Sequence, residues 1–255
     1  MGNKKTTMVN LKNKNNLINE KNHNYFGSFL SLEKIIKPLL FLFFIASLLS
    51  CSAQEKSKTY YEGREFTFQV EISKDSSILE KREIKLKVTG GLRAKIMTGG
   101  QIGIQYIYPG VIDSTTGKDL IETTGAIDNG ERVFIHPPRM AYMTFAEIPP
   151  MPDIRRNTEI GVSSEGVLSG IKGHGNLDGK EIKQVDTVVA KKDVKLFDKE
   201  YDNIWIIKGE NTNYLEELGK YKATYWFDEN YGFIRMKYEK PNGEIIDLKL
   251  KGVKD

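Results

Sequence analysis

Alternation of apolar and polar residues with a period of two is the feature of this chain that most constrains its fold. It begins after residue 60 and recurs in the segments 66–72, 84–88, 221–227, 234–238 and 246–250. Side chains of a β-strand point alternately to the two faces of a sheet, so each segment would have one apolar and one polar face. Helical periodicity is almost absent. The pattern therefore predicts an antiparallel sheet with one face buried and one face in water.

Turn signals separate the predicted strands. Asp75-Ser76-Ser77 follows the first alternating segment, Asp228–Gly232 lies between two later ones, and Asn242-Gly243 is a hairpin signal. Further strands are expected at 102–108, 165–171, 181–190 and 203–209. The expected fold class is all-β or β-dominated, with an antiparallel curved sheet arranged as a half-barrel or a sandwich.

One short helix is expected at Asn213–Gly219. Asn213 is a suitable N-cap, Glu216 stands three residues later, and Gly219 would end the helix. Leu215 and Leu218 would point inward. Strands and helices do not alternate elsewhere in the chain, which excludes a doubly wound or TIM-barrel architecture.

The first fifty residues differ in charge from the rest. They carry seven of the 38 basic and two of the 34 acidic side chains, which leaves 31 basic and 32 acidic residues for the remainder. A body so close to neutral lacks the positive field that binds nucleic-acid phosphates. Nucleic acid is therefore not an expected partner.

An apolar run from Pro38 to Ser50 follows Lys34 and Lys37 and ends at Cys51, the only cysteine. The run is shorter than the roughly 20 residues that span a bilayer as a helix. A basic segment before a short apolar run is typical of a signal peptide. We therefore expect a signal peptide with a long basic part at 1–50, the anchor cysteine and a polar tether at 51–60, and a single β-rich domain at 61–255.

The end of this run, Leu48-Leu49-Ser50-Cys51, resembles the lipobox of bacterial lipoproteins. The resemblance implies that the Cys51 thiol receives a diacylglyceryl group and that the signal peptidase cuts before this residue. Two or three acyl chains anchor a protein stably. Ser52 stands where an aspartate retains enterobacterial lipoproteins in the inner membrane, so the outer membrane is the expected destination in a diderm host. The alternative is an ordinary cysteine at the end of a signal anchor.

Motifs for catalysis are sparse. Gly161–Glu165 lacks the final glycine of GxSxG, and Ser169–Lys172 lacks the companion motifs of S-x-x-K enzymes. The body holds two histidines, His136 and His174, and we interpret the glycine-rich segment 173–179 as a hairpin loop rather than a cation site. No nucleotide-binding glycine motif occurs. We predict no catalytic residue, no metal and no cofactor.

The segment 136–157 has an unusual composition. It holds five of the eight prolines, three methionines and two aromatic residues. Proline cannot donate to a sheet ladder, and it stiffens an extended chain. We interpret the segment as a strap that packs apolar side chains against the sheet while it crosses between two sets of strands. The alternatives are a lid or a docking strip for a partner.

The two tryptophans, Trp205 and Trp226, are the candidate ligand contacts. Each is out of phase with the apolar residues on either side of it. The alternation predicts that both project from the face opposite the main apolar row. There they would either pack into a second apolar face or form an exposed platform for a ligand.

The C-terminal segment Tyr225–Met236, YWFDENYGFIRM, resembles the closing hairpin of Bacteroidota envelope lipoproteins with a β-rich body. Some of these families are similar in outline to the half-barrel of lipoprotein carriers, in which an antiparallel sheet wraps an apolar cavity. The resemblance brings no catalytic residues with it.

Three functions follow as hypotheses. The leading one is a non-enzymatic envelope lipoprotein, tethered through Cys51, whose β domain binds an apolar ligand or a protein partner at the membrane surface. The second is an anchored hydrolase that acts on envelope glycan or lipid, and the third is a structural assembly role. A polar pocket with His136 or His174 beside carboxylates would favour the hydrolase. A continuous apolar groove would favour the carrier, and a packed core without a cavity would favour the assembly role.

Overall fold

The structure is a computed structural model that describes residues 58–91 and 101–255. Cys51, the predicted signal peptide and most of the predicted tether lie outside the described residues. Within those residues, no helix is both long and apolar enough to cross a membrane.

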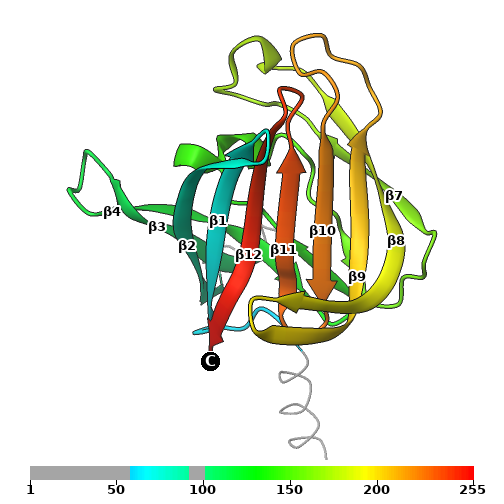
Figure 1. Cartoon of the computed structure of the whole chain (residues 1–255). Coiled ribbons are helices and arrows are strands. Elements are labelled where there is room, and N and C mark those ends of the chain that lie inside the picture. Colours follow the sequence, from blue (N-terminus) through cyan, green and yellow to red (C-terminus); the bar gives the residue numbers. More distant parts are fainter. Residues whose placement is uncertain (1–57, 92–100) are drawn as a thin grey trace, which may run out of the picture. The chain divides into compact units, whose positions relative to one another are not determined.

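Twelve strands in the described residues form one antiparallel sheet (Figure 1). Their bounds are β1 (Glu65–Lys74), β2 (Ser77–Gly91), β3 (Ile102–Ile112), β4 (Asp119–Asp128), β5 (Arg132–Ile135), β6 (Ile154–Arg155), β7 (Ser163–Leu168), β8 (Ile182–Leu196), β9 (Lys199–Asn211), β10 (Lys222–Asp228), β11 (Gly232–Glu239) and β12 (Glu244–Lys254). The sheet curves, which confirms the predicted β-dominated fold with an antiparallel curved sheet.

Strand order places the middle of the chain at the two edges of the sheet. The order is β6-β5-β4-β3-β2-β1-β12-β11-β10-β9-β8-β7. Strands that follow each other in the chain are therefore neighbours, with one exception: β6 and β7 lie at opposite edges. The central pair is β1 with β12, and the loop 156–162 joins the two edges.

One face of the sheet, here called the inner face, carries the core. Val70 on β1 and Leu248 on β12 are paired across the central ladder, and both are fully buried. The inner face continues through Phe66, Leu86 and Tyr106, which are paired across β1, β2 and β3 and are all buried. Full burial of each large apolar side chain contributes about 1.5–3 kcal/mol to stability. The apolar residues of the predicted alternating segments thus form the inner face of the sheet.

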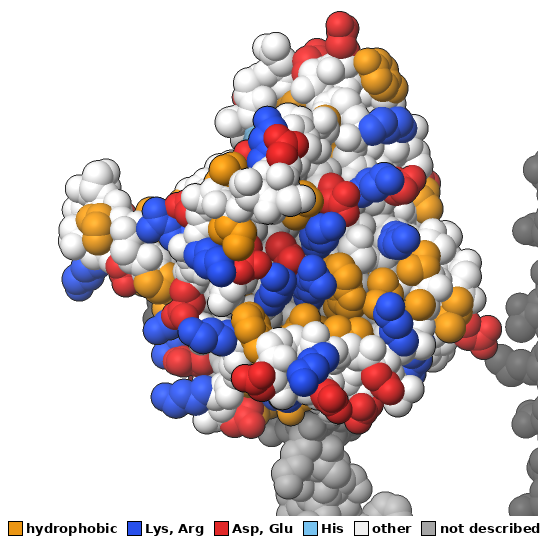
Figure 2. Space-filling model, in the orientation of Figure 1, with side chains coloured by type: hydrophobic (Ala, Val, Ile, Leu, Met, Phe, Trp, Pro, Cys, Tyr) orange, Lys and Arg blue, Asp and Glu red, His pale blue; other side chains and the backbone are white. Residues whose placement is uncertain are grey.

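The outer face is polar and carries paired charges. Arg235 donates to both carboxylate oxygens of Asp247 at 2.9 and 2.7 Å, and Lys249 lies 2.6 Å from Glu71. Figure 2 shows basic and acidic side chains scattered among apolar ones on the side of the molecule turned to the viewer. Such partly exposed pairs contribute roughly 0–1 kcal/mol each.

The predicted turns form where the sequence places them. Asp75 and Ser76 adopt positive φ angles of 49° and 65° between β1 and β2, as in the tight turns of hairpins. Gly232, at the start of β11, has φ 71°, and a Cβ atom there would collide with the Tyr60 hydroxyl. Only glycine therefore fits this turn without a shift of its neighbours.

Strands β4, β5 and β6 were not predicted from the sequence. In β4 the usual pattern is inverted: Ile121 is 49% exposed, whereas Glu122 is 2% exposed and faces inward. Glu122 accepts a hydrogen bond from the Tyr108 hydroxyl at 2.7 Å and one from Arg139 Nε at 2.8 Å. A buried carboxylate with two partners can replace an apolar side chain, and this removes the alternation signal.

The predicted helix at Asn213–Gly219 is wrong in its position. Those residues form a turn closed by the Gly219 N–H, which donates to Leu215 O at 2.8 Å. The Asn213 side chain does not cap a helix, because it accepts from Lys183 N at 2.9 Å and donates to Glu181 O at 2.7 Å. The described residues instead contain two short 3-10 helices, η1 (Ala141–Glu147) and η2 (Gly175–Leu177).

The segment 136–157 is a strap, as predicted. It contains η1 and leads from β5 to β6, behind the sheet in the view of Figure 1. Met143 and Ala146 are fully buried, and Met151 is 7% exposed. The strap therefore belongs to the core of the inner face.

Tyrosine hydroxyls of the sheet hold the strap at both ends. Tyr106 donates to His136 O at 2.8 Å near its beginning. Near its end, Tyr225 donates to Pro150 O at 3.4 Å, and the Tyr238 hydroxyl lies 3.6 Å from the Met151 sulfur. The Tyr106 and Tyr225 hydroxyls thus donate to backbone carbonyls of the strap at residues that have no ladder partner.

Candidate functional site

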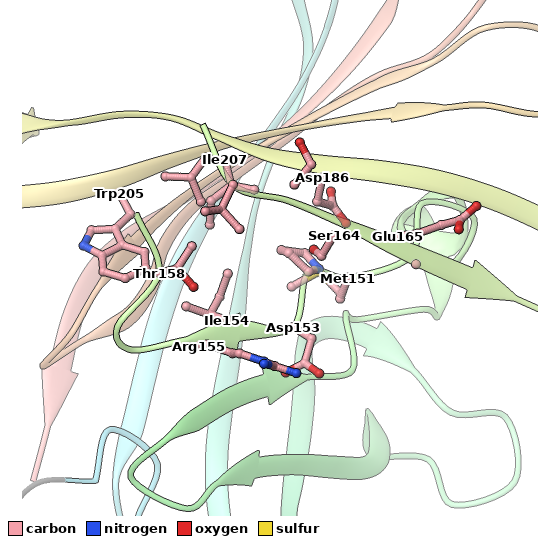
Figure 3. Close-up of a pocket in the computed structure, with 15 residues that line it drawn as sticks. Met151, Asp153, Ile154, Arg155, Thr158, Ser164, Glu165, Asp186, Trp205 and Ile207 are labelled. Atoms are coloured by element: carbon pink, nitrogen blue, oxygen red, sulfur yellow. The ribbon is translucent and has the colours of Figure 1, made fainter. Parts of the chain in front are cut away.

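A cavity of about 460 Å³ lies between the two edges of the sheet (Figure 3). One wall is formed by the end of the strap and β6, with Met151 and Ile154. The opposite wall is formed by β7, β8 and β9, and Thr158 of the loop 156–162 also lines the space. We call this space the seam cavity, because it lies between β6 and β7, the two edge strands, which do not pair with each other.

Asp186 on β8 is the buried charged group of the seam cavity. The residue is 3% exposed, and its Oδ1 accepts a hydrogen bond from Gln184 Nε2 at 2.7 Å. The same amide nitrogen donates to Pro150 O at 2.8 Å, which ties the carboxyl group to the strap. Burial raises the pKa of Asp186 to about 7, and the hydrogen bond from Gln184 opposes this shift.

Two strand glycines make room for these polar side chains. Gly209 on β9 pairs with Asp186, and a Cβ atom there would lie 2.5 Å from both Asp186 Oδ1 and Gln184 Nε2. Gly166 on β7 pairs with Gln184, and its Cβ would lie 2.9 Å from Pro150 Cβ. Glycine inside a strand often marks such a close approach. This signal was present in the sequence and was missed.

Trp205 on β9 lines the seam cavity and is 4% exposed. Its strand partner is Phe227 on the inner face, and the two ring centres are 6.4 Å apart. The indole nitrogen lies on the side of the ring away from Asp186 (Figure 3), and no acceptor for it occurs among the described residues. The cavity therefore meets an aromatic carbon surface at this wall.

Trp226 on β10 lies on the other face of the sheet and does not line the seam cavity. Its strand partner is Arg235, whose guanidinium carbon is 4.5 Å from the centre of the indole ring. Cations stack on tryptophan in this way at sheet surfaces. The guanidinium group, which also pairs with Asp247, thus stacks on the ring, for which an exposed platform was one of the two alternatives.

The two tryptophans project from opposite faces, so the prediction of a shared face is wrong for Trp205. All four residues from Ile204 to Ile207 are buried, so buried and exposed residues do not alternate in this stretch of β9. The register with β8 also shifts between Val188 and Ala190. Alternation therefore could not assign the direction of Trp205.

Neither histidine lines the seam cavity. His136 stacks edge-on against Phe134 at 5.0 Å, and burial together with the nearby Arg139 lowers its pKa. His174 Nε2 lies 2.9 Å from Glu147 Oε2. In the described ranges, no group of three or more His, Cys, Asp or Glu side chains is arranged to hold a metal ion.

The glycine-rich segment 173–179 joins β7 to β8, as the hairpin interpretation predicts. Asp178 closes the loop by accepting hydrogen bonds from the backbone N–H groups of His174 at 2.7 Å and Gly173 at 3.0 Å. These two bonds lower the pKa of Asp178. Its carboxylate thus has a structural role in the loop.

No protein-family model matches the chain, and no curated protein matches it in sequence. A similar solved structure is a Bacteroides fragilis protein described as exported and with a YmcC-like fold, at TM-score 0.46 and 14% identity over 76% of this chain and 97% of that one. A Parabacteroides distasonis protein described as a lipoprotein has TM-score 0.44 and 11% identity over 76% and 96%. A LolA superfamily protein from Nitrosomonas europaea has TM-score 0.26 and 8% identity over 80% and 91%. Each TM-score is below 0.5, and the assignments below rest on the sequence and the structure of this chain alone.

Proposed function

We propose that this protein is a lipid-anchored lipoprotein of the bacterial envelope whose β domain binds a small amphipathic molecule in the seam cavity. The observation that carries the proposal is the cavity itself, about 460 Å³ in volume, in which the apolar side chains of Val188, Trp205 and Ile207 lie beside one buried carboxyl group and polar side chains line the remainder. Ligand sites are commonly concave, of about 300–1,000 Å³, and largely apolar with a few placed polar groups. The lipobox at Cys51 supports the anchor.

The strap limits the size of the proposed ligand. Met143 and Met151 fill the inner face, which in an open half-barrel would be free for long acyl chains. The seam cavity lies at the end of the strap, between the two sheet edges. We therefore propose a ligand with a short apolar part rather than a long-chain lipid.

The same features support binding over the two alternative functions. A hydrolase with a histidine beside carboxylates in its pocket is not favoured, because His136 and His174 lie elsewhere. A purely structural role is not favoured either, because the core leaves a cavity with Asp186 in its wall. A protein partner at the membrane surface and the outer membrane as destination remain predictions, the latter supported by Ser52 after the anchor cysteine.

The proposal can be tested by closing the cavity from one wall. Ser164 on the edge strand β7 pairs with Asp186 and lines the cavity, so Ser164→Phe should fill part of the space. Val167 on the same strand is 52% exposed and does not line it, which makes Val167→Phe the matched control. Each protein would be purified from host membranes and measured by native mass spectrometry before and after solvent extraction.

We expect an extractable molecule of definite mass on the unaltered protein and on Val167→Phe. We expect its loss from Ser164→Phe, because the phenyl ring would occupy its place. Equal retention by both variants would contradict binding in the seam cavity, as would an unaltered protein that carries nothing extractable.

A further inference from the structure

We infer that the seam cavity recognises an amine, whose ammonium group pairs with the Asp186 carboxylate. This inference rests on the proposed function, since it names the chemical class of the molecule that the cavity binds. It follows from the hydrogen bonds of Asp186, the charges around this residue and the apolar wall beside it.

The first observation is an acceptor without a donor. Asp186 Oδ1 accepts from Gln184, but among residues 58–91 and 101–255 no donor lies within hydrogen-bond distance of Oδ2. Asp186 is 3% exposed, and it lines the cavity. A carboxylate oxygen in this position needs a donor from the ligand or from water.

The second observation is the distribution of charge. No described lysine, arginine or histidine forms an ion pair with Asp186, although the carboxyl group is buried. The guanidinium group of Arg155, the exposed residue of β6, lies across the cavity from Asp186 (Figure 3). Glu165 also lines the cavity, but it is exposed. Among the charged side chains that line the cavity Asp186 is the buried one, and the buried end is therefore negative.

Burial of a carboxylate without a cation has a free-energy cost, and this cost appears in the raised pKa of Asp186, about 7. An ammonium group removes the cost, because it supplies the opposite charge and three N–H donors at once. A carboxylate or phosphate ligand would add to the cost at this end. A neutral hydroxyl would supply one donor but no charge.

The third observation is the surface beside the carboxyl group. Trp205, Ile207 and Val188 form an apolar wall next to Asp186. A short alkyl chain that follows the ammonium group would contact this wall. Lys191 Nζ already lies 5.4 Å from the centre of the Trp205 ring, so the indole contributes an apolar surface to this wall rather than a cation site. Together, the carboxylate and this wall fit a primary amine with a short apolar substituent.

The two tryptophans provide a direct measurement. In the Trp226→Phe chain, Trp205 in the cavity wall is the sole tryptophan; in Trp205→Phe, the sole tryptophan is Trp226 on the outer face. The full chain in phosphatidylcholine vesicles would be titrated with hexylamine, hexanol and hexanoate at about pH 8, where Asp186 is ionised and the amine keeps its proton. The readout is the emission of each tryptophan.

We expect hexylamine to change the emission of Trp205 at about tenfold lower concentration than hexanol, because both can donate to the ionised carboxylate but only the ammonium group adds the opposite charge. Asp186→Asn should bring the two ligands within about twofold of each other. It should still respond to hexanol, which shows that the variant is folded. Trp226 should respond to none of the three.

Two results would overturn the inference in different ways. If hexanol or hexanoate acts as strongly as hexylamine, or if Asp186→Asn keeps the preference for the amine, the cavity binds without amine recognition and the proposed function stands. If none of the three affects Trp205, or if Trp226 responds equally, both the inference and binding in the seam cavity are contradicted.

Discussion

Glycines on the two strands adjacent to β8 leave space for the side chains of Asp186 and Gln184. Its partner on β9 is Gly209, and the neighbouring Gln184 faces Gly166 on β7. A side chain at Gly209 would displace the carboxyl group and its amide partner together. The chain thus holds a buried carboxyl group, whose burial costs free energy, next to a glycine that leaves space for it.

The stability of the protein should depend on pH through this residue. The pKa of Asp186 is about 7 in the folded protein and near its ordinary 3.8 after unfolding. A raised folded pKa means that stability is fully present below about pH 4 and is lost as the pH rises through about 7. Asp186→Asn should therefore be more stable than the unaltered chain at about pH 8, by up to about 4 kcal/mol, and equal to it below about pH 4.

Urea unfolding across this pH range measures the difference. Glu165→Gln, which removes an exposed carboxyl group from the lining of the same cavity, is measured alongside as the control. A gain in Asp186→Asn that stays constant with pH would show that the charge of the buried carboxyl is not its cause.

Part of the candidate site could be predicted from the sequence. Trp205 was a candidate contact and lines the cavity, although its direction was wrong. The predicted strand 181–190 places Gln184 and Asp186 in phase with Ile182 and Val188, so two polar residues stand in the apolar row. That irregularity was a signal for the site and was missed. The pairing of β7 with β8 and the approach of Pro150 could not be found, because they depend on contacts between distant segments.

At the scale of elements, the strap decides how much of the inner face is free. Its 3-10 helix η1 places Met143 against the sheet, while Met140 just before it is 41% exposed. The strap was predicted because five prolines exclude a ladder partner and its methionines need a surface to cover. Strand β4 could not be predicted in the same way, because Glu122 is buried by two polar partners that alternation does not reveal.

Packing of the strap can be tested with two methionines three residues apart. Met143→Ala should lower the free energy of unfolding by about 2–5 kcal/mol, because it leaves a cavity in the core. Met140→Ala should change it by less than about 0.5 kcal/mol. Urea unfolding monitored by circular dichroism would distinguish them. Similar values for the two variants would contradict a strap packed against the sheet.

At the scale of the whole molecule, the segment that ends the predicted tether is fixed firmly to the sheet. Asp128 at the end of β4 accepts hydrogen bonds from the backbone N–H groups of Thr59 and Tyr60. Arg64 donates to Thr59 O at 2.7 Å and to Asn230 O at 2.8 Å. The end of the predicted tether, at Thr59 and Tyr60, is therefore hydrogen-bonded to the β domain.

Membrane attachment should depend on Cys51 alone. Substitution Cys51→Ala removes the thiol that the lipobox would acylate, and we expect the protein to leave the membrane fraction after alkaline carbonate washing. Ser57→Ala, within the same predicted tether, should remain attached. Retention of Cys51→Ala in the washed membranes would contradict the lipoprotein assignment.

The central ladder of the sheet also has a consequence for how the protein folds. Glu71 on β1 and Lys249 on β12 form an ion pair although 178 residues separate them in the chain. Every other ladder among the described strands joins consecutive strands and can form early as a hairpin. The middle of the sheet, however, closes only when both ends of the domain have been synthesised, and such high contact order slows folding. A chain of this topology would remain unfinished during synthesis, which is the state that a translocation channel requires of a protein that crosses a membrane before it folds.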